Sequence, residues 1–251
     1  MIVRPNMADK VVINDPKIAE LFKAGAHFGF VKSRRHPSAK PFIFGSKNKI
    51  EIFDLEKVKL ELEKALKFIE DKAAEGATLI FVGGKSEARQ GVKNAGDALS
   101  MPYVHGRWIG GTLTNFPEIR KRVMKLEDLT TQKEKGELGK YTKKERLLID
   151  RDIAKLTMYF SGLHLMKALP KIMVVIDPKK EHIAVEEAKR MRIPVVALAG
   201  SDCNLHDVEF AIPANDSSVS SINLVLGEIV NAFRAGKMRQ KPVEAEAPKV
   251  K

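Results

Sequence analysis

The chain has almost no cysteine and no long apolar run, and each absence excludes a class of protein. Its one cysteine, Cys203, cannot form an internal disulfide, so the fold does not require an oxidising compartment. No stretch approaches the roughly 20 apolar residues of a membrane span, and the start MIVRPNMADK lacks the apolar core of a signal peptide. The sequence therefore predicts a soluble cytoplasmic protein with no membrane partner, starting at Met1 or Met7.

What the sequence has in excess is positive charge, and this charge is unevenly distributed. The 251 residues include 44 Lys and Arg against 32 Asp and Glu, a net charge of +12. Residues 1–50 hold ten cations against three anions, and residues 114–167 hold thirteen against eight, so these two segments carry the whole excess. A neutral scaffold with two basic appendages favours a polyanion as partner, although a solvated basic face without a partner has the same composition.

Apolar runs that alternate with amphipathic segments predict an α/β fold. The unbroken apolar runs are typical of parallel strands buried on both faces, and the segments between them have helical periodicity. We therefore expect a mainly parallel sheet flanked by helices, of the Rossmann or flavodoxin-like kind. The expected strands are 78–82, 103–104, 171–176, 195–199 and 210–212, and the expected helices are 15–24, 56–75, 85–99, 181–191 and 219–233.

Residues 114–167 interrupt this alternation with two heptad-like apolar patterns. The first pattern runs from Phe116 to Leu126 and the second from Ile149 to Leu163, with apolar residues three or four positions apart. Two helices joined by a short tip, packed as an inserted antiparallel helical hairpin (a coiled coil), explain both patterns, and two ordinary core helices are the alternative. The predicted division is therefore an α/β domain of residues 1–113 and 168–236, the hairpin 114–167, and a disordered tail 237–251.

Three basic segments are candidates for contact with a polyanion. Residues 31–40 form a loop with four Lys and Arg residues, and the run from Phe42 to Phe53 predicts two short strands around the turn Gly45-Ser46-Lys47-Asn48. The segment HGRWIGGTLTNF places Arg107 beside the chain's one tryptophan, Trp108, in a glycine-rich turn. There the backbone and a guanidinium group can approach phosphates, while the indole either stacks on a base or fills the core.

Two patterns suggest enzyme chemistry, and both are incomplete. The segment FVGGKSEARQG resembles a phosphate-binding loop, but Leu79 stands where a Walker A loop needs its first glycine. A nucleotide-dependent enzyme that uses Lys85, Ser86 and Asp177 is the alternative of a different class. Cys203 and His206 supply only half of a structural zinc site. We therefore predict no catalytic residues, no metal, no cofactor and no small-molecule substrate.

Several ordered motifs carry a resemblance to a known family. The runs AGAHFGF, KPFIFGSKNKIEIFDLEK, LIFVGGK, RWIGGTLTNF, YTKKERLL, VVIDPKKEHIAVEEA and IPVVAL resemble, in this order, the small-subunit ribosomal protein S-two family of bacterial type. The chain differs from common family residues at Phe30, His36, Gly106 and Phe116. The resemblance implies an α/β domain with a protruding coiled-coil hairpin. It also implies a structural role in the small ribosomal subunit, with small-subunit rRNA and neighbouring ribosomal proteins, including the large S-one protein, as partners.

The resemblance and the charge pattern together give a set of RNA-binding candidates. The resemblance assigns an RNA-facing or assembly role to the matching residues of the glycine-rich turn and of the β-turn, and the other candidates are exposed cations expected from the pattern. A free RNA-binding adaptor that shares the fold remains a further alternative. The candidates are Lys32, Arg34, Arg35, Lys47, Asn48, Lys49, Arg107, Gly110, Gly111, Thr114, Asn115, Arg120, Lys121 and Arg122.

Overall fold

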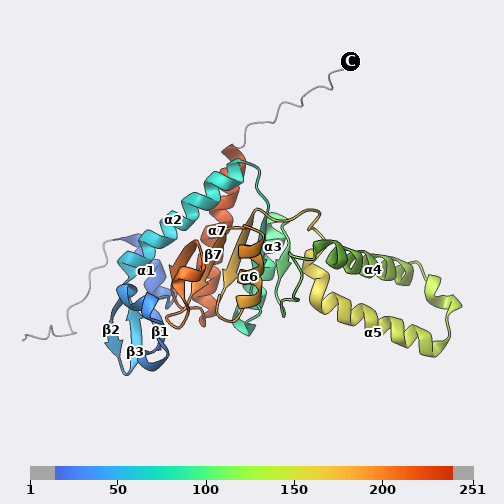
Figure 1. The fold of residues 1–251 in the computed structure, drawn as a ribbon, viewed down its shortest axis with the longest axis horizontal. Helices are drawn as coiled ribbons and strands as arrows, with labels where there is room; N and C mark the ends of the chain where they lie inside the picture. Colours follow the sequence, from blue (N-terminus) through green and yellow to red (C-terminus); the bar gives the residue numbers. More distant parts are fainter. Residues whose placement is uncertain (1–14, 240–251) are drawn as a thin grey trace, which may run out of the picture.

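The computed structural model describes residues 15–239, and Figure 1 shows their arrangement. The choice between Met1 and Met7 as start, and the predicted disorder of residues 240–251, lie outside the described residues. Helix α7 (Val219–Arg239) continues six residues beyond the expected end of that helix. The predicted start of the disordered tail at residue 237 is therefore wrong, because residues 237–239 form the last turn of α7.

The core of the molecule is a five-stranded parallel sheet with the order β5-β4-β6-β7-β8. Counted from its first strand along the chain, this order is 2-1-3-4-5, the flavodoxin-like arrangement. The predicted α/β class with a parallel sheet is thus confirmed. The strands are β4 (Leu79–Val82), β5 (Tyr103–Val104), β6 (Ile172–Ile176), β7 (Val195–Ala199) and β8 (Phe210–Pro213).

Side chains that alternate along each strand supply two separate cores, one on each face of the sheet. In β4, Leu79 and Phe81 belong to one apolar cluster, and Ile80 and Val82 belong to the other. Both faces are therefore buried, which explains why these strands read as continuous apolar runs. The first face is covered by α2 (Leu55–Ala74), α3 (Ser86–Leu99) and α7, and the second by α6 (His182–Arg190) and the first turns of α4.

A small antiparallel sheet precedes this domain. Helix α1 (Pro16–Lys23) is followed by β1 (Phe28–Val31), β2 (Ile43–Lys47) and β3 (Ile50–Phe53), paired in the order β1-β3-β2. Strand β1 was not predicted, and the turn between β2 and β3 is Asn48-Lys49, two residues later than expected. Both turn residues have positive φ, 51° and 68°, which is the backbone twist that two-residue hairpins require.

Two long helices follow β5 and lie side by side as they leave the sheet (Figure 1). These are α4 (Phe116–Glu134) and α5 (Lys143–Phe160), and a capping box of Thr142 and Glu145 begins the second. Lysines of α4 pair with aspartates of α5 across their contact, Lys125 with Asp152 at 3.4 Å and Lys133 with Asp150 at 2.7 Å. Short 3-10 turns occur at Lys32–Arg34, Pro37–Phe42, Glu137–Lys140, Ser161–Leu163 and Leu205–Asp207.

Within residues 15–239, no helix combines the length and the apolar character needed to cross a membrane.

Candidate nucleic-acid interface

The glycine-rich turn after β5 is held by one buried carboxylate, that of Glu187 on α6. Its Oε1 accepts hydrogen bonds from the Gly111 amide at 2.7 Å and from the Trp108 indole at 3.1 Å. Its Oε2 accepts from the Leu113 amide at 2.9 Å and from the amide and hydroxyl of Thr114, each at 3.2 Å. Five donors therefore converge on one side chain, and they tie the start of α4 to the sheet domain.

The protonation of Glu187 follows from this environment. Burial alone would raise its pKa, but the hydrogen bonds from Leu113, Trp108, Gly111 and Thr114 outweigh burial and hold the pKa below its ordinary value. The carboxylate is therefore ionised at neutral pH. Gly111 has φ +92°, a conformation that side chains other than glycine rarely adopt, and this φ brings its amide onto the carboxylate.

This arrangement divides the candidates of the turn into two groups. The amides of Gly111 and Thr114 already donate to Glu187, so at these positions the expectation of direct contact by backbone or hydroxyl donors is not supported. Arg107, Gly110 and Asn115 are exposed and do not donate to Glu187, although the Asn115 amide donates to the Gly111 carbonyl at 2.8 Å. Trp108 is buried, so of the two interpretations the core residue is correct.

The N-terminal basic loop also contains one cation that serves the fold. Lys32 and Arg34 are exposed, as a contact surface requires. Arg35, by contrast, pairs through its Nη1 with the Glu51 Oε1 at 2.8 Å, and the Glu51 side chain is only 2% exposed. Since Arg35 neutralises a buried carboxylate, its predicted role as a free RNA-binding cation is not supported.

The tip of the β2–β3 hairpin presents a compact polar group. Lys47, Asn48 and Lys49 are all exposed there, and the two-residue turn places Asn48 and Lys49 at its end. No ion pair joins either lysine to a carboxylate of the described residues. The structure thus keeps these three candidates together at one projecting point.

The three consecutive cations of α4 point in different directions, as expected from helical spacing. Arg120 is half-buried, and its Nη1 donates to the His164 carbonyl at 3.4 Å. Lys121 pairs with Glu118 at 2.6 Å on the same helix, and both side chains are exposed. Arg122 is exposed, so it and Lys121 are the two members of this group that a ligand reaches directly.

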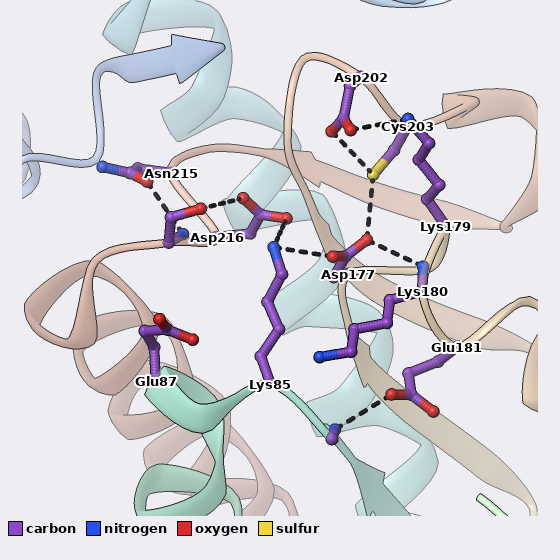
Figure 2. A network of polar contacts seen from close by, with 12 residues as sticks. Lys85, Glu87, Asp177, Lys179, Lys180, Glu181, Asp202, Cys203, Asn215 and Asp216 are labelled. Carbon is purple, nitrogen blue, oxygen red and sulfur yellow. Dashed lines mark hydrogen bonds and ion pairs between the residues drawn. The ribbon is translucent and has the colours of Figure 1, made fainter. Parts of the chain in front are cut away.

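A buried charged network occupies the carboxyl ends of the central strands (Figure 2). The Lys85 ammonium lies 2.7 Å from Oδ2 of Asp177, which follows β6, and 2.7 Å from Oδ2 of Asp216, which follows β8. Burial alone would lower the Lys85 pKa, but the hydrogen bonds and charges of the two aspartates raise it above its ordinary value. Lys85 is therefore a permanent internal cation, and the alternative in which it binds a nucleotide is not supported.

Cys203 completes this network and does not fit a catalytic role. Its Sγ lies 3.6 Å from the Asp177 Oδ1, and burial, followed by the charges of nearby aspartates, raises its pKa. His206 is exposed, and among residues 15–239 the only cluster that could ligate a metal joins Asp177, Cys203 and Asp216 within 4.8 Å. Because the Lys85 ammonium already pairs with both carboxylates of that cluster, we assign no metal to it.

Two buried acids at the centre of these arrangements, Glu187 and Asp216, were not predicted. Glu187 lies in the helical run EHIAVEEAKR, and nothing in that run distinguishes it from the exposed Glu186 except its place on the buried face of α6. Asp216 follows β8, at the strand end where α/β folds place polar groups, and this position was the available signal.

The fold and the site together define a class, that of flavodoxin-like α/β proteins with cations on projecting segments. Comparison with known proteins gives the family. The family model described as ribosomal protein S2 matches residues 21–236. The chain therefore belongs to the ribosomal protein S2 family.

Its relatives include proteins named small ribosomal subunit protein uS2 from three bacteria. The protein of Sulfurimonas denitrificans is 42% identical over 218 residues, covering 87% of this chain and 84% of the relative. That of Coprothermobacter proteolyticus is 41% identical over 220 residues, covering 88% and 82%. That of Thermus thermophilus is 40% identical over 228 residues, covering 90% and 89%.

Proposed function

We propose that this chain is a structural, non-enzymatic component of the small ribosomal subunit in the cytoplasm. In that role it binds small-subunit rRNA and neighbouring ribosomal proteins and supports subunit assembly and translation. The observation that carries this proposal is the family match over residues 21–236, together with relatives that are at least 40% identical over most of both chains.

The distribution of charge supports RNA as the main partner. Exposed cations project at three places: the loop with Lys32 and Arg34, the β-hairpin tip with Lys47 and Lys49, and the turn with Arg107. Neutralising backbone phosphates with such side chains releases counterions, and the contact needs no particular base sequence. The proposed role of the sheet domain is to hold these three points in a fixed relation.

We further propose that α4 and α5 form an inserted coiled-coil hairpin, a unit distinct from the α/β domain, which within the described residues comprises residues 15–113 and 168–239. Its apolar contacts are narrow, since Ile119, Val123 and Phe160 are buried while most other positions of the two helices are exposed. A helix pair with so little core fits an arm whose surface contacts a partner, with Lys121 and Arg122 as RNA-facing cations.

An apolar surface formed by α1 and the N-terminal sheet supports contact with a neighbouring protein. Phe22, Phe28 and Phe44 are 53%, 46% and 78% exposed, and Phe22 stacks on His27 with ring centroids 4.4 Å apart. Large exposed aromatic side chains that gather at one place are typical of protein interfaces. We assign this surface to a neighbouring ribosomal protein, and the S-one protein stays a prediction as its partner.

Sedimentation of the full chain with small subunits tests the proposal. The wild-type chain should co-sediment with small subunits in a sucrose gradient. The variant Arg120→Gln/Lys121→Gln/Arg122→Gln should show a smaller bound fraction at low salt, and its binding should depend less strongly on salt than that of the wild type. Losing up to three phosphate contacts should lower the log-log salt slope of rRNA binding by up to about 2 to 3.

A matched control separates the hairpin from general charge. The variant Lys57→Gln/Lys64→Gln/Lys67→Gln removes an equal number of positive charges, three, from the exposed side of α2, and it should leave the bound fraction unchanged. A wild-type chain that stays at the top of the gradient would contradict the ribosomal role and favour a free adaptor. Equal losses in both triple variants would contradict the hairpin as a contact surface.

A further inference from the structure

A cavity of about 340 Å³ lies at the carboxyl ends of the central strands. It is bordered by Gly84 after β4, Arg107 and Trp108 after β5, and Lys180 and Glu181 after β6. Strand β4 lies between β5 and β6. The chain passes from β4 to β5 on one side of β4 and later enters β6 on its other side. This is the topological switch point, where flavodoxin-like sheets place their ligands.

Cations dominate the lining of this cavity. Arg89, Arg107 and Lys180 all contribute to it, and none of them forms an ion pair with a carboxylate of residues 15–239. The one acid of the lining is Glu181, which is buried and whose Oε1 accepts the Gly84 amide at 3.2 Å. Three unpaired cations against one hydrogen-bonded acid leave the cavity positive, a field that attracts anions.

The pKa of a neighbouring histidine, His105, is lowered in part by one of these cations, Arg89. Burial lowers the pKa of His105, which follows β5, and the positive charges of Lys93 and Arg89 lower it further. These two cations act on His105 against the opposing charge of Asp97, and the lowered pKa leaves His105 without a positive charge at neutral pH.

Resting on the proposed function, we propose that this cavity binds a backbone phosphate of RNA through Arg89, Arg107 and Lys180. Two guanidinium groups and an ammonium match the oxygens of a phosphodiester, to which arginine binds with two parallel hydrogen bonds. Arg89 and Lys180 lie outside the two basic appendages, residues 1–50 and 114–167. They would give the sheet domain a phosphate contact of its own.

The neighbouring contacts favour a phosphodiester over a free nucleotide. A nucleotide-binding loop offers its glycine amide and its lysine to the β- and γ-phosphates. In this chain the Gly84 amide donates to Glu181. The Lys85 ammonium pairs with Asp177 and Asp216, as Figure 2 shows. The Trp108 indole donates to Glu187, so it holds the turn and is not free to stack on a base. The groups left to bind a ligand are the cations Arg89, Arg107 and Lys180, which suit one phosphate recognised by its charge.

Filter binding of the full chain to a small-subunit rRNA transcript tests this proposal. Arg89→Gln and Lys180→Gln should each weaken binding and lower the log-log salt slope by at most about 0.7 to 0.9, the whole contribution of the one shared phosphate. Arg190→Gln, a matched control at the far end of α6, should change neither quantity. Urea unfolding of each variant should show that the fold is retained.

Competition distinguishes the two sources of phosphate. Millimolar ATP or inorganic phosphate should displace little of the transcript. If ATP binds the wild-type chain more tightly than the transcript does, and Lys180→Gln abolishes that binding, the RNA assignment is overturned. If both variants bind the transcript like wild type while the hairpin triple variant does not, this cavity is excluded and the proposed function stands. If no variant changes binding, and the wild-type chain does not sediment with subunits, both proposals fail.

Discussion

The sheet domain and the pair of helices α4 and α5 both contain many lysines, but they hold them in opposite ways. Lys85 lies inside the sheet domain between two aspartates, with 15% of its side chain exposed. Lys125 and Lys133 of α4 pair with aspartates of α5 while more than half of each lysine side chain stays exposed. Exposed pairs contribute about 0 to 1 kcal/mol, so an RNA phosphate can replace the carboxylate at little cost. Burial thus decides whether a cation serves the fold or a ligand.

Replacing the buried cation Lys85 is the most direct test of this difference between buried and exposed lysines. In Lys85→Met, Asp177 and Asp216 lose their counter-charge while still buried, so the free energy of unfolding should fall by about 3 to 5 kcal/mol. Urea denaturation measures this loss. Lys179→Met is the control. The Lys179 side chain is 57% exposed, so its ion pair with Asp202 should contribute at most about 1 kcal/mol to stability. Equal losses in the two variants would show that burial does not decide the role of these lysines.

Glu187 is the next test, because it joins the two regions. In Glu187→Gln, an amide nitrogen replaces one accepting oxygen and faces donors of the turn, which should cost about 1 to 3 kcal/mol. Amide hydrogen exchange should accelerate at Gly111 and Leu113, whose N–H groups donate to this carboxylate. Glu186→Gln, on the exposed side of the same helix, should change stability by no more than about 0.5 kcal/mol. Unchanged exchange at Gly111 would contradict the role of Glu187.

The same variant gives a pH dependence with a definite sign. The folded state holds the Glu187 pKa below its ordinary value of 4.5, so the unfolded chain binds this proton more readily. The stabilisation is complete at pH above 4.5 and is lost as pH falls through the folded pKa. The difference in unfolding free energy between wild type and Glu187→Gln should therefore be constant above pH 4.5 and shrink as the pH falls below it. A difference that stays constant below this pH as well would show that Glu187 is not ionised in the fold.

The sequence predicted the strands and helices of the sheet domain well, because their apolar periodicity is set by burial on one or both faces. It also located the excess charge. It could not show which cations are already paired, since Glu51 and Asp216 are distant in sequence from Arg35 and Lys85 and meet them only through strand pairing. Strand β1 was missed because its four residues, FGFV, include a glycine, a residue that is depleted in strands and weakens the strand signal.

The smallest expected effect on stability is that of Arg34→Gln, and its neighbour Arg35 allows the same comparison to be made inside a single loop. Arg34 is exposed without a carboxylate partner in the described chain, whereas Arg35 pairs with the buried Glu51. Arg34→Gln should leave the unfolding free energy within about 0.5 kcal/mol of wild type and lower the salt slope of rRNA binding by about 0.7 to 0.9.

Arg35→Gln should show the reverse. It leaves the Glu51 carboxylate buried without its cation, which should destabilise the chain by about 1 to 3 kcal/mol, while the salt slope should not change. Urea denaturation and filter binding on both variants separate the two roles. If Arg35→Gln lowers the salt slope as much as Arg34→Gln does, a cation that neutralises a buried acid also contacts RNA, and pairing alone no longer tells the two roles apart.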